Sequence, residues 1–210
     1  MAATIRPSEQ PDDDLLRGIR AGDAEAFTTV YRRCHGPVYR FALHMSGSRP
    51  VAEDVTQEVF MTLIEGGGGF DSSRGTLARY LLGVARNRML RRLEKERSYT
   101  FLPEPEASPD ERRTNSFNHD NLIVLPVDPV REETIGLVRQ AVLSLPASYR
   151  EVVALCDLQE MSYEEAAKVI DCAVGTVRSR LHRARTLLMQ KLHDRRDSQE
   201  CAASVRPARS

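Results

Sequence analysis

Five side chains of types that bind nucleic acid share one face of a predicted helix that begins near Val174. They are Thr176, Arg178, Ser179, His182 and Arg183. At about 100° per residue these positions lie together, and no acidic residue occurs between 174 and 193. A helix of this width enters the DNA major groove, where Arg donates two bonds to guanine and Ser or Thr contacts bases or phosphates. The pattern predicts a helix that reads DNA.

A second short helix and a tight turn are expected to hold this DNA-reading helix. Ser162 is a typical N-cap, and Glu165 three residues later completes a capping box. The turn at 171–173 has the length found in helix-turn-helix motifs. The buried side of both helices is predicted at Ala166, Ala167, Ile170, Val174, Val177, Leu181, Ala184 and Leu188. The alternative is a solvated basic face on a surface helix, which the coincidence of cap, turn and apolar seam disfavours.

The composition narrows the classes of protein to which the chain can belong. Its 210 residues allow one or two domains, and 30 basic and 30 acidic side chains cancel, so net charge predicts no partner. We find no signal peptide and no run of ~18 apolar residues, so insertion into a membrane is not expected. Four cysteines without CxxC spacing disfavour a zinc ribbon or a disulfide framework. A soluble intracellular protein with reduced thiols is expected.

The segment 12–97 reads as one compact helical domain. Apolar spacing and breakers predict five helices: one over about 12–21, one capped by Asp23, one after Gly36-Pro37, one from Pro50 and one from near Thr76. The second helix is expected to end at Gly36-Pro37, because Pro lacks the N–H that a helix interior needs. The glycine run 66–69 must end the fourth helix.

Two surfaces of this domain carry charge that packing alone does not require. The fourth helix has a polar side at 53–58, which is usually only solvated. The fifth helix carries six basic and two acidic residues over 86–97, next to Tyr80 and a loop with Phe70 and Arg74. Such a surface suits a nucleic-acid backbone with aromatic rings for unstacked bases. The alternative is a helix end whose cations complement the helix dipole.

A change in composition separates this domain from a second one. Residues 98–134 contain five prolines and eight acidic residues and show no helical period, which predicts an extended linker. Residues 135–193 read as four short helices that include the helix-turn-helix, and the ends 1–11 and 194–210 are predicted to be disordered. The predicted fold class is therefore all-α, with two small helical domains joined by a flexible linker and a C-terminal helix-turn-helix four-helix domain.

Three stretches resemble bacterial RNA polymerase sigma factors of the sigma-70 family, extracytoplasmic-function (ECF) class. They are AEDVTQEVF (52–60), ARYLLGVARN (78–87) and LPASYREVVAL…MSYEEAAKVIDCAVGTVRSRLHRAR (145–185). The resemblance covers about 12–97 (region 2-like) and 135–193 (region 4-like). It implies a cytoplasmic specificity subunit, with no catalytic residue, cofactor or metal, that directs promoter-specific transcription initiation. The implied partners are core RNA polymerase, promoter DNA and an anti-sigma factor.

The resemblance also assigns roles to single positions. It implies that Asp54, Gln57 and Glu58 contact the clamp helices of the largest polymerase subunit, and that the region 4-like domain meets the flap of the second-largest subunit. It implies that the opened −10 element is bound by Phe70, Ser72, Ser73, Arg74, Tyr80, Asn87 and Arg88, and the −35 element by Thr176, Arg178, Ser179, His182 and Arg183. Two departures concern the −10 site: Tyr80 stands where the family usually has Trp, and 66–69 replaces a stretch that is normally helical.

Two other functions are weighed against this one. A dimeric helix-turn-helix repressor or activator would account for the second domain, but it leaves DVTQEVF and the basic fifth helix without a role. An enzyme would need a site such as a metal bound by Cys34, His35 and His44, and the first two are adjacent, which is poor ligand geometry. The glycine run is not followed by GK[ST], so it is not a phosphate-binding P-loop.

Overall fold

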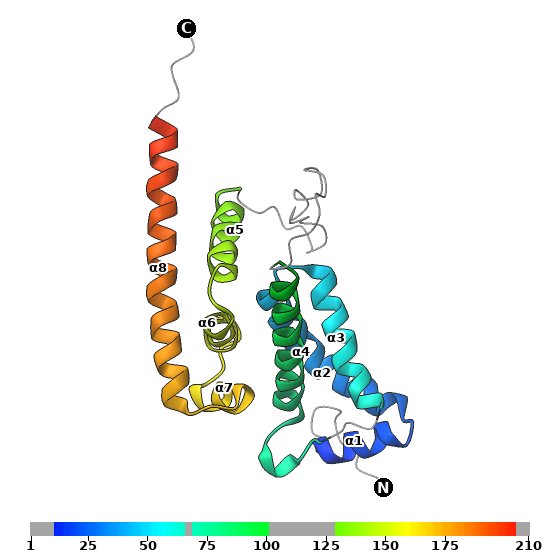
Figure 1. Cartoon of the computed structure of the whole chain (residues 1–210). Helices are drawn as coiled ribbons and strands as arrows, with labels where there is room; N and C mark the ends of the chain where they lie inside the picture. The colour runs from blue at the N-terminus through cyan, green and yellow to red at the C-terminus, as the bar shows by residue number, and fades with distance from the viewer. Residues whose placement is uncertain (1–10, 66–68, 101–128, 205–210) are drawn as a thin grey trace.

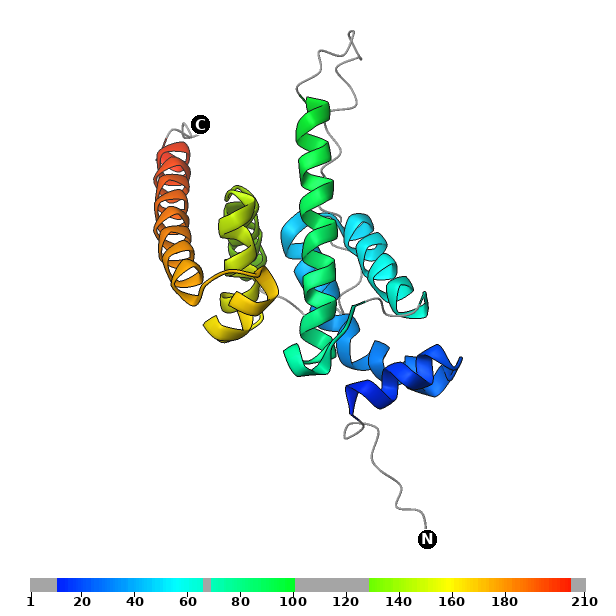
Figure 2. The same cartoon turned by 60° about the horizontal axis from the view of Figure 1, so that its bottom comes forward.

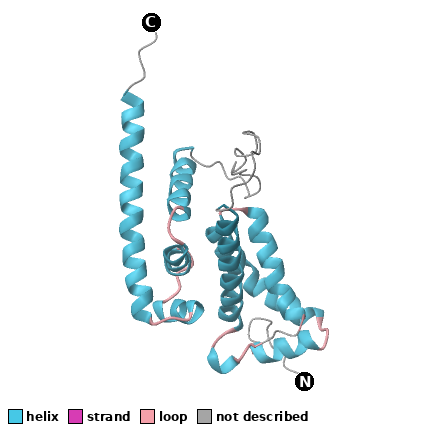
Figure 3. Ribbon diagram, viewed as in Figure 1, coloured by secondary structure: helices cyan, strands magenta, loops and turns pink. Residues whose placement is uncertain are grey.

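The structure is a computed structural model that describes residues 11–65, 69–100 and 129–204. The described part is helical and contains no strand (Figure 3). Its elements in chain order are α1 (Asp12–Arg20), α2 (Ala24–Ser46), α3 (Arg49–Ile64), the short 3-10 helix η1 (Ser72–Arg74), α4 (Leu77–Thr100), α5 (Pro129–Leu143), α6 (Ala147–Val152), the π-helix η3 (Val153–Asp157), α7 (Tyr163–Ile170) and α8 (Val174–Ser204). Helices α1–α4 form a first module and α5–α8 a second one (Figure 1).

The first module is built around α2, which packs against α1, α3 and α4. Asp23 caps α2 as predicted, accepting hydrogen bonds from the backbone N–H groups of Glu25 and Ala26. Gly47 ends the helix in the left-handed conformation (φ 71°), which favours glycine. The core takes fully buried side chains from each helix: Leu15, Val30, Phe41, Met45, Leu63, Leu81 and Met89.

The predicted break at Gly36-Pro37 is wrong, because α2 runs without interruption from Ala24 to Ser46. A proline inside a helix costs about 3 kcal/mol, since it removes one hydrogen bond and crowds the preceding turn. The flanking residues Cys34, Val38 and Phe41 are buried, and burying each such side chain is worth roughly 1.5–3 kcal/mol. The packing of this face therefore outweighs the local preference for a break.

Three predicted boundaries also differ from the structure, always because a helix is longer than expected. The linker was expected over 98–134, but α4 reaches Thr100 and α5 already begins at Pro129, a favourable first residue of a helix. The C-terminal segment was expected to be disordered from 194, but α8 continues to Ser204. The expectations for residues 1–10, 101–128 and 205–210 lie outside the described residues.

The second module places the helix-turn-helix on a small core of its own. The predicted capping box is confirmed: the Ser162 hydroxyl accepts from the Glu165 N–H, and the Glu165 carboxylate accepts from the Ser162 N–H. Asp171 ends α7 in the left-handed conformation (φ 57°) and starts the turn into α8. The core consists of Leu145, Val152, Leu155, Ala166, Ile170, Val177, Leu181 and Ala184.

The two modules pack against each other in the described structure. Helix α4 contacts α7, and α2 contacts both α5 and α6; Figure 2 shows the second module beside α4. The buried apolar residues of both modules form one continuous cluster. Arg150 of α6 crosses the boundary, donating to the backbone carbonyls of Leu143 and Leu145 in its own module and of Met45 in the first.

Candidate nucleic-acid interfaces

Helix α8 presents the predicted DNA-reading face to solvent. Arg178, Ser179, His182 and Arg183 are exposed, and Thr176 is half-buried. The opposite side is confirmed as the buried seam, with Val177, Leu181 and Ala184 fully buried and Val174 and Leu188 packed at its edges. The structure therefore brings together all five residues predicted for this face.

Several interactions restrict the side chains on and beside this face. The Arg178 guanidinium lies over the Tyr163 ring of α7, 5.9 Å from its centroid. The two arginines at the edges of the face have carboxylate partners: Arg180 donates to Glu151 at 3.1 Å, and Arg185 to Asp157 at 2.5 Å. These edge arginines therefore anchor α8 to α6 and η3, whereas Arg178 and Arg183 are the exposed arginines of the predicted face itself.

A compact loop before α4 holds Phe70, Ser72, Ser73 and Arg74 of the residues predicted for the −10 site, and Tyr80 follows in the first turn of α4. The Asp71 side chain accepts from the Ser73 N–H at 3.0 Å and from the Ser73 hydroxyl at 2.7 Å, and these bonds lower the pKa of Asp71. Phe70 and Tyr80 meet edge to face, with ring centroids 5.7 Å apart. Ser72, Ser73 and Arg74 are exposed. The loop and the first turn of α4 thus together offer two adjacent aromatic rings and exposed donors.

Asp12 of α1 ties this loop to the rest of the first module, a role that sequence reasoning missed. Its carboxylate accepts from the backbone N–H of Leu77 at 2.7 Å and from Arg33 at 3.0 Å. The Leu77 N–H belongs to the first turn of α4, where backbone donors lack helical partners. Asp12 therefore acts as a cap supplied from 65 residues away, and no local sequence signal reveals such a partner.

The last two residues predicted for the −10 site differ in position. Asn87 is exposed, and its side-chain oxygen accepts from Arg86 at 3.4 Å. Arg88 instead points to α3, where it donates to Glu58 at 2.7 Å and to the Thr62 hydroxyl at 3.1 Å. The structure therefore does not bring Arg88 to the Phe70 loop; it joins Arg88 to the residues predicted to bind polymerase.

The predicted polymerase contacts lie together on α3. Asp54 and Gln57 are exposed, and Glu58 is half-buried beside Arg88 and Arg92 of α4. Burial opposes ionisation of Glu58, but the hydrogen bonds from Arg92 and Arg88 outweigh it and lower its pKa. Glu58 is thus an ionised, fixed group at neutral pH, whereas Gln57 is exposed and Asp54 remains largely exposed although it lies 3.5 Å from Arg92.

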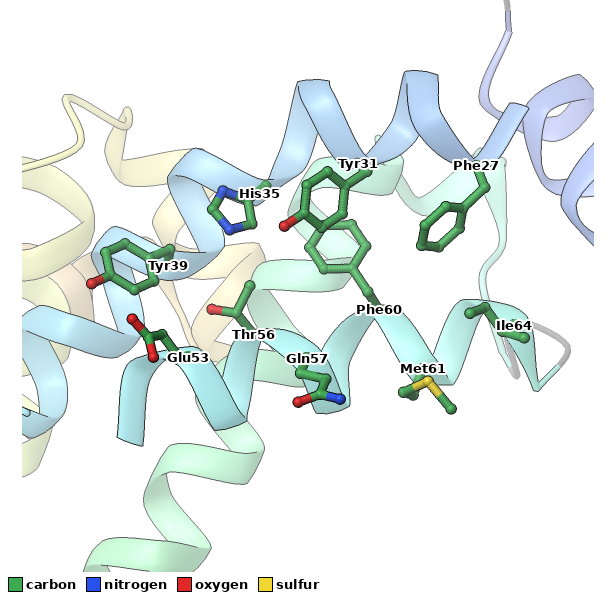
Figure 4. Close-up of a pocket in the computed structure, with 10 residues that line it drawn as sticks. All are labelled: Phe27, Tyr31, His35, Tyr39, Glu53, Thr56, Gln57, Phe60, Met61 and Ile64. Atoms are coloured by element: carbon green, nitrogen blue, oxygen red, sulfur yellow. The ribbon is translucent and has the colours of Figure 1, made fainter. Parts of the chain in front are cut away.

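An apolar groove between α2 and α3 adjoins these residues (Figure 4). Rings from one side of α2 line it at four-residue spacing: Phe27, Tyr31, His35 and Tyr39. From α3 come Phe60, Met61 and Ile64, and the exposed fractions of Tyr31, Met61 and Ile64 are 40%, 43% and 56%. Exposed apolar groups gathered in one groove are typical of a protein-binding surface. The aromatic spacing in α2 is the signal by which the sequence could have revealed it.

The geometry thus defines a two-module helical protein with a helix-turn-helix, an aromatic loop and an apolar groove. Residues 30–99 match the family described as Sigma-70 region 2, and residues 135–188 match Sigma-70, region 4. The chain is 31% identical to the ECF RNA polymerase sigma-E factor of Escherichia coli (strain K12), over 88% of this chain and 96% of that protein. It is 29% identical to the ECF RNA polymerase sigma factor SigW of Bacillus subtilis (strain 168), over 85% and 95%.

Two solved structures share the fold. The sigma factor RpoE from Bartonella quintana, in complex with the anti-sigma factor NepR, superposes with a TM-score of 0.58 at 23% identity, covering 81% of this chain and 98% of that one. CnrH, in complex with the cytosolic domain of CnrY, gives 0.60 at 22% identity, covering 87% and 97%. The chain belongs to the ECF class of RNA polymerase sigma factors in the sigma-70 family, whose members act in promoter-directed transcription initiation.

Four observations bear on the other functions weighed from the sequence. Across the described ranges, no three His, Cys, Asp or Glu side chains lie close enough to hold a metal ion. Burial raises the pKa of the Cys34 thiol to about 11, so it stays protonated and is a poor ligand or nucleophile. None of the described helices is long and apolar enough to cross a membrane. The family match also covers the first module, which a simple repressor leaves without a role.

Proposed function

We propose that this sigma factor binds core polymerase through the α2–α3 groove, opens the −10 element at the Phe70–Tyr80 loop and reads the −35 element with α8. The observation that supports the proposal is that the groove, the loop before α4 and the α8 face are all exposed on modules with buried cores. The groove residues Met61 and Ile64, the loop residues Ser72 and Arg74 and the α8 face all reach solvent. The role is that of a non-enzymatic subunit working in the cytoplasm.

Promoter opening in this proposal uses binding energy rather than chemistry. Extruding a base from a duplex costs a few kcal/mol, and stacking on an aromatic side chain returns roughly 1–3 kcal/mol per base. Phe70 and Tyr80 provide two rings, 5.7 Å apart between centroids, so two captured bases would offset most of this cost. Polymerase contacts must supply the remainder. The proposal therefore requires that the free chain cannot open a promoter alone.

Polymerase binding is assigned to the groove together with Asp54 and Gln57 at its rim. The groove supplies apolar area, and the exposed polar groups of α3 supply orientation, which is the usual division in a protein interface. The region 4-like module would meet the flap. We include an anti-sigma factor among the partners, in line with the complexes of the two similar structures.

A matched pair of variants tests the groove. The double substitution Met61→Glu/Ile64→Glu places two charges in it, and because both side chains are substantially exposed, the fold should persist. We expect binding to core polymerase, measured by fluorescence anisotropy, to weaken at least about tenfold, as for loss of an interface hot spot. Thr28→Glu, exposed on α2 but outside the groove, is the control. Equal affinities of the double variant and the control would refute the assignment.

A further inference from the structure

Arg79, in the first turn of α4, folds back over the loop that precedes the helix. We call residues 70–75 the readout loop, and Gly75 is its last residue. A Cβ built on Gly75 would overlap a terminal nitrogen of Arg79 and would lie 3.2 Å from its guanidinium carbon. The Arg79 side chain is only 17% exposed. The guanidinium therefore occupies the space that any side chain at position 75 would need.

Gly75 is also the residue at which the chain turns from the readout loop into α4. Its backbone has φ 145° and ψ −168°, a region of conformational space that essentially only glycine adopts. Its N–H donates to the Ser72 carbonyl at 3.3 Å and closes the short 3-10 helix η1. The direction in which the loop leaves α4 is thus set at this one residue, and the group packed on it is the Arg79 guanidinium.

Two consecutive residues of α4 hold the two ends of the readout loop. At its beginning Phe70 meets the Tyr80 ring, with centroids 5.7 Å apart, and at its end Gly75 lies under Arg79. The exposed residues 72–74 lie between these two contacts. The hydrogen bonds described above for this part of the chain are made within the loop, so they fix its shape but not its direction. The two contacts with α4 therefore decide how the exposed donors are oriented relative to the rings.

The position of Arg79 is unfavourable for folding. A cation in the first turn of a helix is opposed by the positive end of the helix dipole. The Arg79 Nε is buried, and no described residue provides a hydrogen-bond acceptor for it. The carboxylate nearest to it, Glu165 of α7, lies 4.0 Å away and already accepts from the N–H and the hydroxyl of Ser162. Residues that break local rules in this way are expected at functional sites rather than at purely structural ones.

We propose that Arg79 is a positioning residue for readout of the −10 element. Its guanidinium, packed on Gly75, directs residues 72–74 toward the same DNA strand as the Phe70 and Tyr80 rings. Arg79 acts through the loop and makes no DNA contact of its own, because most of its side chain is covered. The role in readout rests on the proposed function above, whereas the contact between Arg79 and Gly75 does not.

A double-mutant cycle in urea unfolding of the full chain tests the contact itself. Gly75→Ala should lower the folding equilibrium constant of the wild type at least about twofold more than that of Arg79→Ala. The backbone strain is the same in both backgrounds, and only the collision with the guanidinium differs. Gly22 is the control, because it also has a positive φ (84°) but nothing lies within 4 Å of its Cβ position. Gly22→Ala should have equal effects in both backgrounds, whereas additive effects of Gly75→Ala and Arg79→Ala would overturn the proposal.

Transcription with core polymerase tests the role in readout, on templates that carry single substitutions in either promoter element. We expect Arg79→Ala to lower discrimination between −10 sequences by about three- to tenfold, the effect of losing one coupling between contacting residues. Discrimination between −35 sequences should not change. Arg32→Ala, at an exposed position of α2, is the matched control and should leave discrimination at both elements as in the wild type.

The salt dependence of binding separates positioning from direct contact with DNA. Loss of a phosphate contact lowers the slope of log K against log salt by about 1. Because Arg79 acts through the loop, Arg79→Ala should bind opened −10 DNA, in complex with polymerase, with the wild-type slope. A lowered slope, or unchanged −10 discrimination in Arg79→Ala, would overturn the proposal. A wild type that does not discriminate between −10 sequences would refute the proposed function and with it the readout role, whereas the contact measured in the free chain would stand.

Discussion

Replacing Arg150 by Met is expected to lower the free energy of unfolding by about 2–4 kcal/mol. The guanidinium donates to the Leu145 carbonyl at 3.0 Å, to the Met45 carbonyl at 2.5 Å and to the Leu143 carbonyl. A hydrogen bond from a charged donor contributes ~1.5–3 kcal/mol. We take less than the sum, because Arg150 is half-buried and water can replace part of what is lost. Met keeps the apolar stem, so the change reports mainly on the three bonds.

Urea unfolding followed by circular dichroism at 222 nm measures this change. Arg32→Met, at an exposed position of α2, is the control and should stay within about 0.5 kcal/mol of the wild type. Arg150→Lys should fall between the two, because an ammonium group cannot reproduce the planar fork of the guanidinium. If Arg150→Met were as stable as the control, the view that this arginine fastens α5, α6 and α2 together would be refuted.

Three further predictions concern DNA readout, loop positioning and pH. Arg178→Ala and Arg183→Ala should each lower use of the −35 element by about 1–3 kcal/mol in transcription assays. Arg180→Ala removes a charge that binds Glu151 and should instead lower the melting temperature. Unchanged −35 selectivity in both Arg178→Ala and Arg183→Ala would contradict the assignment of the DNA-reading face. Asp12→Ala should weaken discrimination between −10 sequences while leaving −35 discrimination intact. Asp12→Asn keeps an acceptor for the Leu77 N–H and should retain most of the −10 discrimination. Equal loss of discrimination at both elements would indicate that Asp12 has only a structural role. Burial, followed by Arg139 of α5 and Arg40 of α2, lowers the pKa of His44 below 6.5. Its contribution to the stability of the fold is therefore present above about pH 6.5 and is lost as the pH falls toward the lowered pKa. His44→Gln should flatten the decrease in melting temperature between pH 8 and pH 5, and an unchanged slope would exclude His44 as its source.

Local sequence signals predicted the second module well because its determinants are close in the chain. The Ser162–Glu165 capping box and the seam through Val177, Leu181 and Ala184 depend on neighbours within a few turns. The same kind of rule failed at Pro37, where burial of the surrounding α2 face outweighs the cost of the proline. A local rule holds only where tertiary packing does not oppose it.

What the sequence did not show are pairings between distant elements. Arg86 and Arg88 look alike on α4, yet one binds Glu151 of the second module and the other Glu58 of α3. The basic excess over 86–97 fitted either a nucleic-acid surface or a solvated helix end, but in the structure Arg86, Arg88 and Arg92 of this stretch have carboxylate partners. Only the fold reveals which charges are already matched, and this decides which ones a ligand can use.

The central claim is that both modules contact one promoter and do so only with polymerase. Run-off transcription with core polymerase on a template carrying both elements tests it most directly, with the −10 and −35 sequences scrambled one at a time. We predict a product only when the chain, polymerase and both elements are present. A product that survives scrambling of either element, or a symmetric footprint of the chain on a palindromic site without polymerase, would contradict the account.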